Sequence, residues 1–416
     1  MESVIVPHER AVMDSVIQTW KLDPVSEGFG VKRLLEEIKR QNGDWSLSEK
    51  RLKSILKKFN LLPGTESEVT YAKDITSLET PGLILPEKIK LTMTSKRGKG
   101  LFAKSNISEG EVIWEEEPLF LVPPLAHVEL IRKGNACSFC GQLVRRSRAG
   151  VSVLSGEQCK MCPEVWCSKA CKSKNQRLHN LMKHEVSKIP LESRKVVPGA
   201  LVSLLDYSLK EQWNALYAIT VITGEIVADE SGMKKEKFDA LARVSQKTRT
   251  RASANGSVSS DSSFLDGQHE QLWEEGHELF LNVFPKLRSV SDYSFENFLF
   301  MLGAYNINNL DSSIFLIQSH LNHNCEPNTD VNTGEARSDT SIKVKASRPI
   351  RAGEEITTTY VNPTHVLQER REELRVNWGF LCKCKRCKDE SKSVSSAAQE
   401  NRPSERKADT KSVHFS

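Results

Sequence analysis

The chain has 416 residues, 27% of them charged, and a formal net charge of +5. This length allows about two or three compact units, and so mild a charge does not by itself indicate a nucleic-acid or membrane partner. The N-terminus lacks the positive start and apolar core of a signal peptide, and no stretch is apolar for the length of a membrane span. We therefore expect a soluble intracellular protein with no membrane partner.

The N-terminal part has a helical pattern. Apolar residues recur at helical spacing in three stretches between residues 10 and 60, which predicts a helical module over residues 1–64, followed by a linker over residues 65–86. Residues 31–60 hold nine Lys or Arg and four Asp or Glu. This local excess indicates either an ordinary exposed helical face or a surface that contacts nucleic-acid phosphate.

From residue 87 the period changes. Ile89, Leu91 and Met93 alternate with polar residues, and further short apolar runs follow as far as residue 122, so residues 87–136 predict short strands joined by tight turns. Gly98 and Gly100 lie among them. A glycine pair is most often turn chemistry, and a ligand lying close to the backbone is the alternative reading.

Residues 137–184 are rich in metal-ligand residues. The chain has ten cysteines, and nine of them lie in CxxC, CxxxC or CxCxxC groups, which favours reduced metal ligands over disulfides. The candidate ligands in this segment are Cys137, Cys140, Cys159, Cys162, Cys167, Cys171 and His179, with His184 as a further candidate. Eight such ligands complete two tetrahedral zinc sites that have no open position, so we expect both to be structural.

The rest of the chain is mainly helical in pattern before it returns to strands. Residues 185–294 have helical periodicity, except that residues 243–266 are rich in Ser, Thr and Arg, which predicts a mobile loop. Residues 295–306 form the most apolar run and predict core. Residues 363–377 predict a charged helix, and the polar residues 389–416 predict a disordered tail.

A further group of thiols lies near the C-terminus. A lone cysteine such as Cys325 is more often a small buried residue than a ligand. Cys382, Cys384 and Cys387 change that balance, because together with Cys325 they supply the four soft ligands of a third zinc site. Between the two halves of this site, residues 357–360 read Thr-Thr-Thr-Tyr, a strand-like run that ends on a phenol.

Four motifs occur in a fixed order: Gly98-Lys-Gly-Leu-Phe102, Asn322-His-Asn-Cys-Glu-Pro-Asn328, Gly353-Glu-Glu-Ile-Thr-Thr-Thr-Tyr360 and Cys382-Lys-Cys-Lys-Arg-Cys387. They resemble the successive signatures of a SET domain, and the cysteine-rich segment between the first two resembles a MYND zinc finger. Over roughly residues 87–388 the chain is therefore similar to the SET and MYND lysine methyltransferases.

The resemblance implies an α+β fold. The SET domain, made of small curved sheets with a pseudo-knot, would be split into residues 87–136 and 295–362 by the MYND finger at 137–184 and a helical insert at 185–294. Residues 363–388 would form a post-SET zinc segment, so the chain would hold two zinc ions in the finger and one after the SET domain.

The resemblance also assigns roles to single residues. It implies S-adenosylmethionine as the cofactor, with a pocket made by Lys99, Gly100, Phe102, Asn306, Asn322, His323 and Phe380. Tyr360 is placed at the reacting centre, and Tyr360 and Trp378 line the lysine channel. It sorts the finger ligands crosswise, with Cys137, Cys140, Cys167 and Cys171 on one zinc and Cys159, Cys162 and His179 on the other.

Three features depart from the family pattern. Asn324 stands where the family usually has Ser, and Lys183 stands where the last finger ligand is usually Cys, so that His184 has to take its place or the second zinc lacks a ligand. The chain also has no long helical C-terminal domain like that of the animal relatives. This last feature and the N-terminal module resemble the fungal branch, which monomethylates lysines of the histone H4 tail.

The expected function follows from that branch. We expect a histone-lysine N-methyltransferase of the nucleus and chromosome, present also in the cytoplasm, whose partners are the histone H4 tail and the nucleosome. Residues 31–60 would contact nucleosomal DNA, and the MYND finger would bind proline-rich partners. The alternatives are a lysine methyltransferase of non-histone proteins and an inert SET and MYND scaffold.

Overall fold

The computed structural model describes residues 6–22, 26, 29–58, 70–94, 97–144, 157–184, 190, 194–253, 260–333 and 339–400. Within these ranges no helix has the length and apolar character needed to cross a bilayer.

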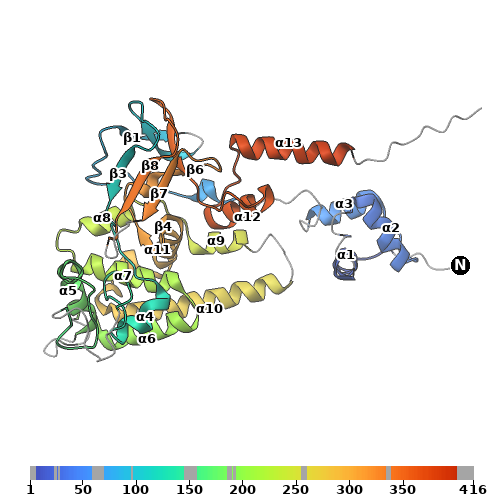
Figure 1. Cartoon of the computed structure of the whole chain (residues 1–416). Coiled ribbons are helices and arrows are strands. Elements are labelled where there is room, and N and C mark those ends of the chain that lie inside the picture. Colours follow the sequence, from blue (N-terminus) through green and yellow to red (C-terminus); the bar gives the residue numbers. More distant parts are fainter. Residues whose placement is uncertain are drawn as a thin grey trace, which may run out of the picture.

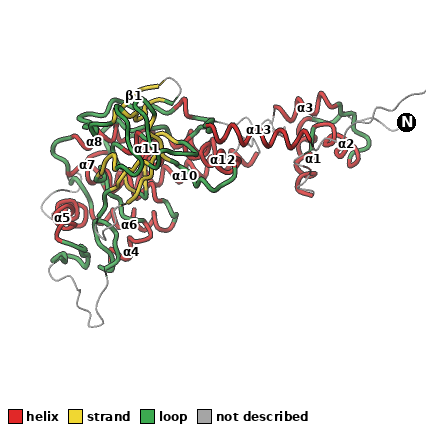
Figure 2. The backbone as a smooth tube through the Cα atoms, turned by 45° about the horizontal axis from the view of Figure 1, so that its top comes forward, coloured by secondary structure: helices red, strands yellow, loops and turns green. Residues whose placement is uncertain are grey.

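Three helices near the N-terminus form a unit with its own core. They are α1 (Glu9–Leu22), α2 (Val31–Gln41) and α3 (Glu49–Lys58). Their apolar faces meet in one cluster that includes Val16, Leu34, Ile38 and Leu52, all fully or almost fully buried. The unit lies away from the strands of the larger body in both Figure 1 and Figure 2.

The described strands form three small sheets. The strands are β1 (Ile89–Thr94), β2 (Gly98–Ala103), β3 (Val112–Glu116), β4 (Asn309–Leu310), β5 (Ser313–Ile314), β6 (Asn322–His323), β7 (Thr329–Thr333), β8 (Ile342–Ala346) and β9 (Glu355–Thr358). Their orders are β1-β2-β9-β6, β3-β8-β7 and β4-β5. Buried residues of the first two sheets, among them Leu101, Val344 and Ile356, share one apolar core.

Two pairings in the first sheet join distant parts of the chain. Leu101 of β2 lies opposite Ile356 of β9 in an antiparallel pair. On the other side of β9, Asn322 of β6 lies opposite Thr357 in a parallel pair. The first glycine motif, the Asn-His-Asn-Cys motif and the strand that leads to Tyr360 are therefore neighbours in one sheet.

Helices make up most of the remaining body. They are α4 (Val128–Arg132), α5 (Lys169–Lys183), α6 (Pro198–Lys210), α7 (Asn214–Ala228), α8 (Met233–Asp239), α9 (Gln246–Ser253), α10 (Ser260–Val283), α11 (Phe295–Asn308), α12 (Leu367–Trp378) and α13 (Lys385–Glu400). The short 3-10 turns are η2 (Ala72–Asp74), η3 (Leu125–His127), η5 (Pro285–Leu287), η6 (Ser291–Tyr293) and η7 (Gln318–His320).

The largest apolar core lies among α6, α7, α10 and α11, below the sheets in Figure 1. The apolar run that predicted core is α11, whose Phe298, Leu299 and Leu302 are fully buried. At Gly303 a Cβ would lie 1.7 Å from the carbonyl oxygen of Val244, so the backbones of α11 and the segment before α9 are in direct contact. This contact fixes α11, the helix that runs into β4.

Two segments that the sequence predicted to be mobile or disordered are partly helical in the structure. Of residues 243–266, expected as a loop, 246–253 form α9 and 260–266 belong to α10, while 254–259 lie outside the described residues. Composition misses this order because α9 is held by long-range contacts: Val244 and Ala252 are buried, and Arg375 of α12 donates to the Ala252 carbonyl at 2.7 Å.

The expected disordered tail over 389–416 differs in the same way. Residues 389–400 continue α13, and 401–416 lie outside the described residues. Glu390 accepts a hydrogen bond of 2.6 Å from the buried Arg370, and Ser391 accepts one of 2.9 Å from Arg371. These bonds to α12 stabilise the first turns of a helix whose polar sequence gives no apolar signal.

Candidate active site and metal centres

A cavity of about 1480 Å³ lies where β6, the end of β9, the end of α12 and residues 70–77 meet. Six of the residues expected at the cofactor or the lysine channel line it: Lys99, Asn322, His323, Tyr360, Trp378 and Phe380. The structure therefore brings together side chains from four separate parts of the sequence. Gly100, Phe102 and Asn306, which were also expected at the cofactor, are not among the described residues that line the cavity.

Gly100 leaves room for the side chain of Asn322. The Asn322 amide donates to the Lys99 carbonyl at 3.0 Å and to Glu355 Oε1 at 2.8 Å. A Cβ on residue 100 would lie 2.7 Å from Asn322 Nδ2 and 2.9 Å from that carboxylate oxygen. Glycine is thus required because Asn322 crosses the strand at this point, and Asn322 is held between β2 and β9.

Asn306 and Phe102 have structural surroundings of their own. Asn306 donates to Gln246 Oε1 at 2.9 Å and so ties α11 to α9. Phe102 lies on β2 opposite Glu355. In the described structure both residues support the elements that surround the cavity.

His323 connects the cavity to the C-terminal cysteines. Its Nδ1 accepts a hydrogen bond of 3.0 Å from the Tyr360 backbone N–H, so the ring proton of the neutral form lies on Nε2. That nitrogen is 3.2 Å from Cys325 Sγ. Both ring nitrogens of this buried residue are thus occupied within the protein, and His323 orients a candidate metal ligand.

Asn324, which replaces the usual serine, closes a local turn. Its side-chain oxygen accepts from the Glu326 N–H at 3.0 Å, and its own N–H donates to the Thr358 carbonyl at 2.8 Å. An asparagine side chain that bonds to the backbone two residues on is an ordinary turn device, and here it keeps Cys325 next to the end of β9.

Tyr360 is held at the cavity with its hydroxyl group engaged. The hydroxyl donates to the Leu321 carbonyl at 2.5 Å, and the ring centroid is 5.0 Å from that of Trp378. Burial raises the pKa of the Tyr360 phenol, and the nearby carboxylate of Glu355 raises it further. The phenol therefore stays protonated near neutral pH and keeps its hydrogen bond to the Leu321 carbonyl, while its oxygen can still accept a hydrogen bond.

Two cavity residues carry no motif signal. Gln318 lines the cavity, and its Oε1 is buried and has no hydrogen-bond partner among the residues that the structure describes. An orphaned buried acceptor of this kind fits a cavity that receives a polar ligand. His320 is only 6% exposed, and burial lowers the pKa of its imidazole to about 4, so it is neutral at physiological pH.

The four C-terminal cysteines converge. The Sγ atoms of Cys325, Cys382, Cys384 and Cys387 all lie within 4.8 Å of one another, and all four residues are buried. The guanidinium of Arg370, which is 0% exposed, lies 3.8 Å from Cys387 Sγ. Four thiolates fit tetrahedral Zn²⁺, and the cation of Arg370 would offset part of the net negative charge of such a site.

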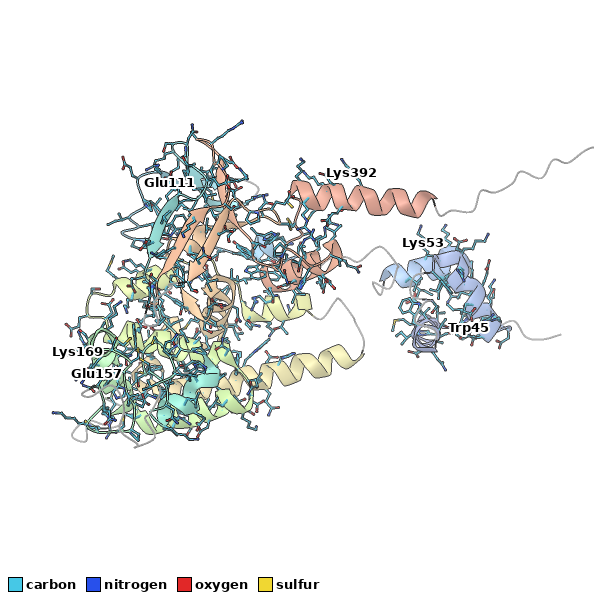
Figure 3. The ribbon with its side chains drawn as sticks, viewed as in Figure 1. Trp45, Lys53, Glu111, Glu157, Lys169 and Lys392 are labelled. Carbon is cyan, nitrogen blue, oxygen red and sulfur yellow. The ribbon has the colours of Figure 1, made fainter. Side chains whose placement is uncertain are left out.

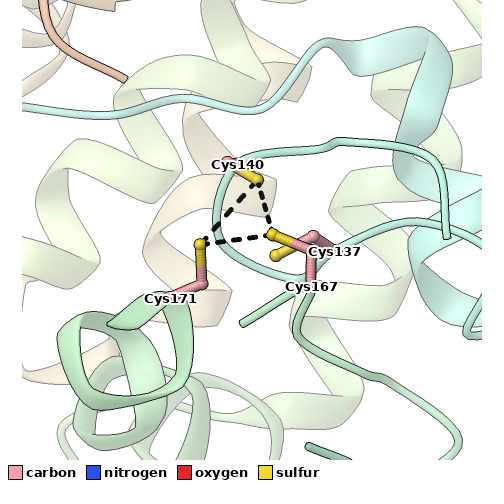
Figure 4. Close-up of side chains that lie close together, drawn as sticks. All are labelled: Cys137, Cys140, Cys167 and Cys171. Carbon is pink, nitrogen blue, oxygen red and sulfur yellow. Dashed lines mark hydrogen bonds between the residues drawn. The ribbon is translucent and has the colours of Figure 1, made fainter. Parts of the chain in front are cut away.

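The finger segment holds two more groups of four. Cys137, Cys140, Cys167 and Cys171 converge as Figure 4 shows, with Cys167 Sγ lying 3.5 Å from Cys140 Sγ and 3.4 Å from Cys171 Sγ. The second group is Cys159, Cys162, His179 and His184. These are the crosswise groups that the resemblance implied, and both donor sets suit zinc.

His184 occupies the place of the missing cysteine in the second group. Its Nε2 lies 3.2 Å from Cys159 Sγ. Lys183, the residue at the family's usual cysteine position, points elsewhere and pairs with Glu164 at 3.1 Å. Helix α5 ends at Lys183, and His184 follows with extended backbone, which is the local adjustment that lets the next residue reach the cluster.

Comparison with known families decides what this arrangement is. The SET domain model matches residues 98–361, which is more than half of the chain. The chain belongs to the SET domain family. The match begins at Gly98 and ends at Val361, so it contains β2, β9 and β6 of the four-stranded sheet, while β1 precedes it. It confirms the expected α+β SET fold, while residues 70–97 and α12 lie outside it.

Named relatives are similar over nearly the whole chain. Histone-lysine N-methyltransferase SET5 of Scheffersomyces stipitis is 51% identical over 397 residues, covering 93% of this chain and 82% of that protein. The protein of the same name from Candida albicans is 49% identical over 396 residues, covering 94% and 82%. A solved structure of the SET domain of LSMT bound to lysine and AdoHcy is matched over 72% of this chain and 54% of that chain, with 13% identity and a TM-score of 0.35.

Proposed function

We propose that this protein is an S-adenosylmethionine-dependent histone-lysine N-methyltransferase. The observation that carries the proposal is the single cavity that joins Asn322, Tyr360, Trp378 and Phe380 in a chain of the SET family. The relatives named histone-lysine N-methyltransferase, similar over more than nine-tenths of the chain, support the same activity. The finer substrate that we propose is lysine of the histone H4 tail, monomethylated in chromatin in the nucleus.

The residues around the cavity suit that reaction. S-adenosylmethionine supplies a methyl group that is already activated on a sulfonium, so the protein mainly has to align and desolvate a lysine amine. A lysine side chain in water has a pKa of about 10.4, and an apolar aromatic channel disfavours the ammonium form. Trp378 and the ring of Tyr360 form such a wall, and the Tyr360 hydroxyl is placed to orient the amine. The orphaned Gln318 acceptor and the Asn322 amide would hold the cofactor.

Methyl transfer from radiolabelled S-adenosylmethionine tests this proposal. Core histones, intact and with tails removed, serve as substrates, and the labelled lysine is mapped by mass spectrometry. We expect label on intact H4 and little on tailless H4. Label that appears only on other proteins of a cell extract would favour a non-histone substrate, and no label on any protein would favour an inert scaffold.

We also propose that the finger segment is a MYND zinc finger that binds two zinc ions and proline-rich partners. A third zinc ion would bind at Cys325 and the three C-terminal cysteines.

In the group of Cys159, Cys162, His179 and His184, Glu164 contacts the ring nitrogen of His179 that faces away from the other candidate ligands. This buried carboxylate lies 3.4 Å from His179 Nδ1 and accepts from the Ser138 hydroxyl at 2.6 Å. It thereby orients His179 of the second group and links it to Ser138, which lies between Cys137 and Cys140 of the first group.

Replacing Glu164 with Gln removes that support. We expect zinc affinity at the second group to fall by about 10- to 100-fold, because the histidine ligand loses its charged partner. Competition with a chromogenic chelator measures the affinity. Glu157→Gln is the matched control, since Glu157 is a buried carboxylate of the same segment that pairs with Lys172 at 3.5 Å. Equal zinc release by the two variants would contradict this role.

The proposed nucleosome contact lies on the N-terminal unit. Helices α2 and α3 expose Lys32, Lys39, Lys50 and Lys53, and Lys53 projects outward in Figure 3. Cations that neutralise phosphates make binding depend on salt. We expect the logarithm of the nucleosome binding constant to fall linearly with the logarithm of salt concentration, and Lys50→Gln with Lys53→Gln to reduce that slope by about two. Binding measured by fluorescence anisotropy that does not change with salt would refute the contact.

A further inference from the structure

A segment that precedes the SET match packs against the cavity. Residues 70–80, called the strap here, include η2, and Ala72, Lys73 and Ser77 line the cavity. Backbone hydrogen bonds hold the strap to the body, among them the reciprocal pair between Thr76 and Arg243, at 3.0 and 2.8 Å. The strap is therefore a fixed wall of the cavity supplied from outside residues 98–361.

The strap also completes the end of α12. The last carbonyls of a helix have no partners within the helix and need donors from elsewhere. Tyr71 supplies two of these donors: its hydroxyl donates to the Val376 carbonyl at 2.9 Å, and its N–H donates to the Gly379 carbonyl at 2.9 Å. The N–H of Ala72 donates to the same Gly379 oxygen at 3.0 Å. A third element contributes, because Arg249 of α9 donates to the Asn377 carbonyl at 3.2 Å.

The ring of Tyr71 lies directly against the turn after α12. Gly379 has a φ of 76°, in the left-handed region, and a Cβ there would lie 2.5 to 2.7 Å from three atoms of the Tyr71 ring. Tyr71 itself is 1% exposed. The ring and Gly379 are thus closely packed, so that a side chain added at residue 379 or loss of the ring at residue 71 should move the turn.

The turn carries the two aromatic residues of the cavity. Trp378 precedes Gly379 and donates from Nε1 to the Ile307 carbonyl at 3.3 Å, with its ring against Tyr360. Phe380 follows Gly379, and its ring centroid lies 6.0 Å from that of His323. A shift of Gly379 therefore moves the lysine-channel wall and the second aromatic wall together.

We propose that Tyr71 is a positioning residue of the active site, which sets the place of Trp378 and Phe380 through Gly379. The proposal rests on the proposed methyl-transfer function for its kinetic consequences. It makes the strap, and not only the SET-matching region, part of the catalytic unit.

Two substitutions of Tyr71 test the proposal by steady-state kinetics with an H4 tail peptide and by titration with S-adenosylhomocysteine. We expect Tyr71→Ala to lower kcat/KM by about 10- to 100-fold, chiefly through a higher KM, and to weaken S-adenosylhomocysteine binding as well. Tyr71→Phe keeps the ring on Gly379 and should restore most of both values. Tyr207→Ala is the control, because Tyr207 also donates a hydrogen bond, to Glu275 at 2.9 Å, but is not among the residues that line the cavity.

A double-mutant cycle separates positioning from a general loss of stability. Gly379→Ala should give the same kinetic defect, and its effect should be smaller in the Tyr71→Ala background, where the ring no longer opposes the added methyl group. Strictly additive effects, or Tyr71→Ala kinetics equal to those of Tyr207→Ala, would overturn the proposal.

Hydrogen exchange keeps the test independent of the reaction. Peptides that cover residues 374–381 should exchange faster in Tyr71→Ala than in Tyr71→Phe and wild type, whatever the substrate is. If wild type transfers no methyl group, the proposed function fails, while this exchange difference still supports the role of Tyr71 in positioning Gly379. Unchanged exchange over these residues would refute that role even in an active methyltransferase.

Discussion

Tyr360→Phe is expected to lower kcat for methyl transfer by about 100-fold or more while it leaves the affinity for S-adenosylhomocysteine within about twofold of wild type. The substitution removes only the hydroxyl, which donates to the Leu321 carbonyl at 2.5 Å. The ring remains packed between His323 and Trp378, at centroid distances of 5.4 and 5.0 Å, so the shape of the cavity is kept. The loss therefore falls on the orientation of the amine and not on the binding of the cofactor.

A matched control is available within the chain. Tyr305 is a buried tyrosine whose hydroxyl also donates to a backbone carbonyl, that of Ser312 at 3.3 Å, but it is not among the residues lining the cavity. Tyr305→Phe should retain kcat, and both variants should melt at similar temperatures. A Tyr360→Phe enzyme with normal kcat would remove Tyr360 from the reacting centre.

The pH dependence adds a second check. Because burial and Glu355 raise the pKa of the Tyr360 phenol, that group stays protonated through the neutral range. The rise of kcat/KM with pH then reflects loss of the proton from the substrate lysine, and it should keep the same midpoint in Tyr360→Phe. A midpoint that moves in the variant would show that the phenol itself titrates in the reaction.

Sequence patterns were sufficient where chemistry and spacing coincide. Cysteine spacing and the family resemblance indicate three groups of candidate metal ligands, with His184 left open as the last member of the second, and the structure brings all of these residues together. Tyr360 and Asn322 lie in motifs, Trp378 was assigned by the family resemblance alone, and all three line one cavity. Motifs are local in sequence, so they identify a residue without saying what it contacts.

The roles of contacts between distant segments could not be predicted in this way. Gly100 was expected at the cofactor, but its lack of a side chain makes room for Asn322, which lies 222 residues further along the chain. Tyr71 belongs to a stretch that reads as linker, and its partner Val376 is 305 residues away. Arg370 looks like any exposed charge on a charged helix, yet it is fully buried beside Cys387. Local patterns do not carry this information, because each role depends on a tertiary partner.

Zinc bound at the four C-terminal cysteines would link stability to activity. Cys382 lies two residues after Phe380, and Cys325 lies two residues after His323. A zinc ion bound there would join the turn that carries Trp378 and Phe380 to the motif that carries Asn322. His323, with Nδ1 bonded to the Tyr360 N–H and Nε2 near Cys325, adds a second connection between the two.

Cys384→Ser should therefore lower the zinc content by about one ion per chain and reduce methyl transfer by about 100-fold or more, since serine is a poor ligand for zinc and the aromatic walls lose their anchor. Loss of a closed structural site in a chain of this size should also lower the melting temperature by roughly 5 °C. Elemental analysis, differential scanning fluorimetry and the histone assay measure the three effects. Lys385→Ser is the control, because Lys385 is an exposed neighbour that is not a candidate ligand.

The changes in zinc content, melting temperature and turnover together distinguish a zinc ion that holds the aromatic walls of the cavity in place from one that only stabilises the fold. If the C-terminal zinc only stabilised the fold, Cys384→Ser would melt earlier but would keep its turnover per folded molecule when assayed well below the melting temperature. Because this group adjoins the turn with Trp378 and Phe380, we expect turnover to fall at low temperature too, with S-adenosylhomocysteine binding weakened in parallel. Full turnover at low temperature would show that the zinc does not hold the aromatic walls in place. An unchanged zinc content would show that this group of cysteines does not bind the metal.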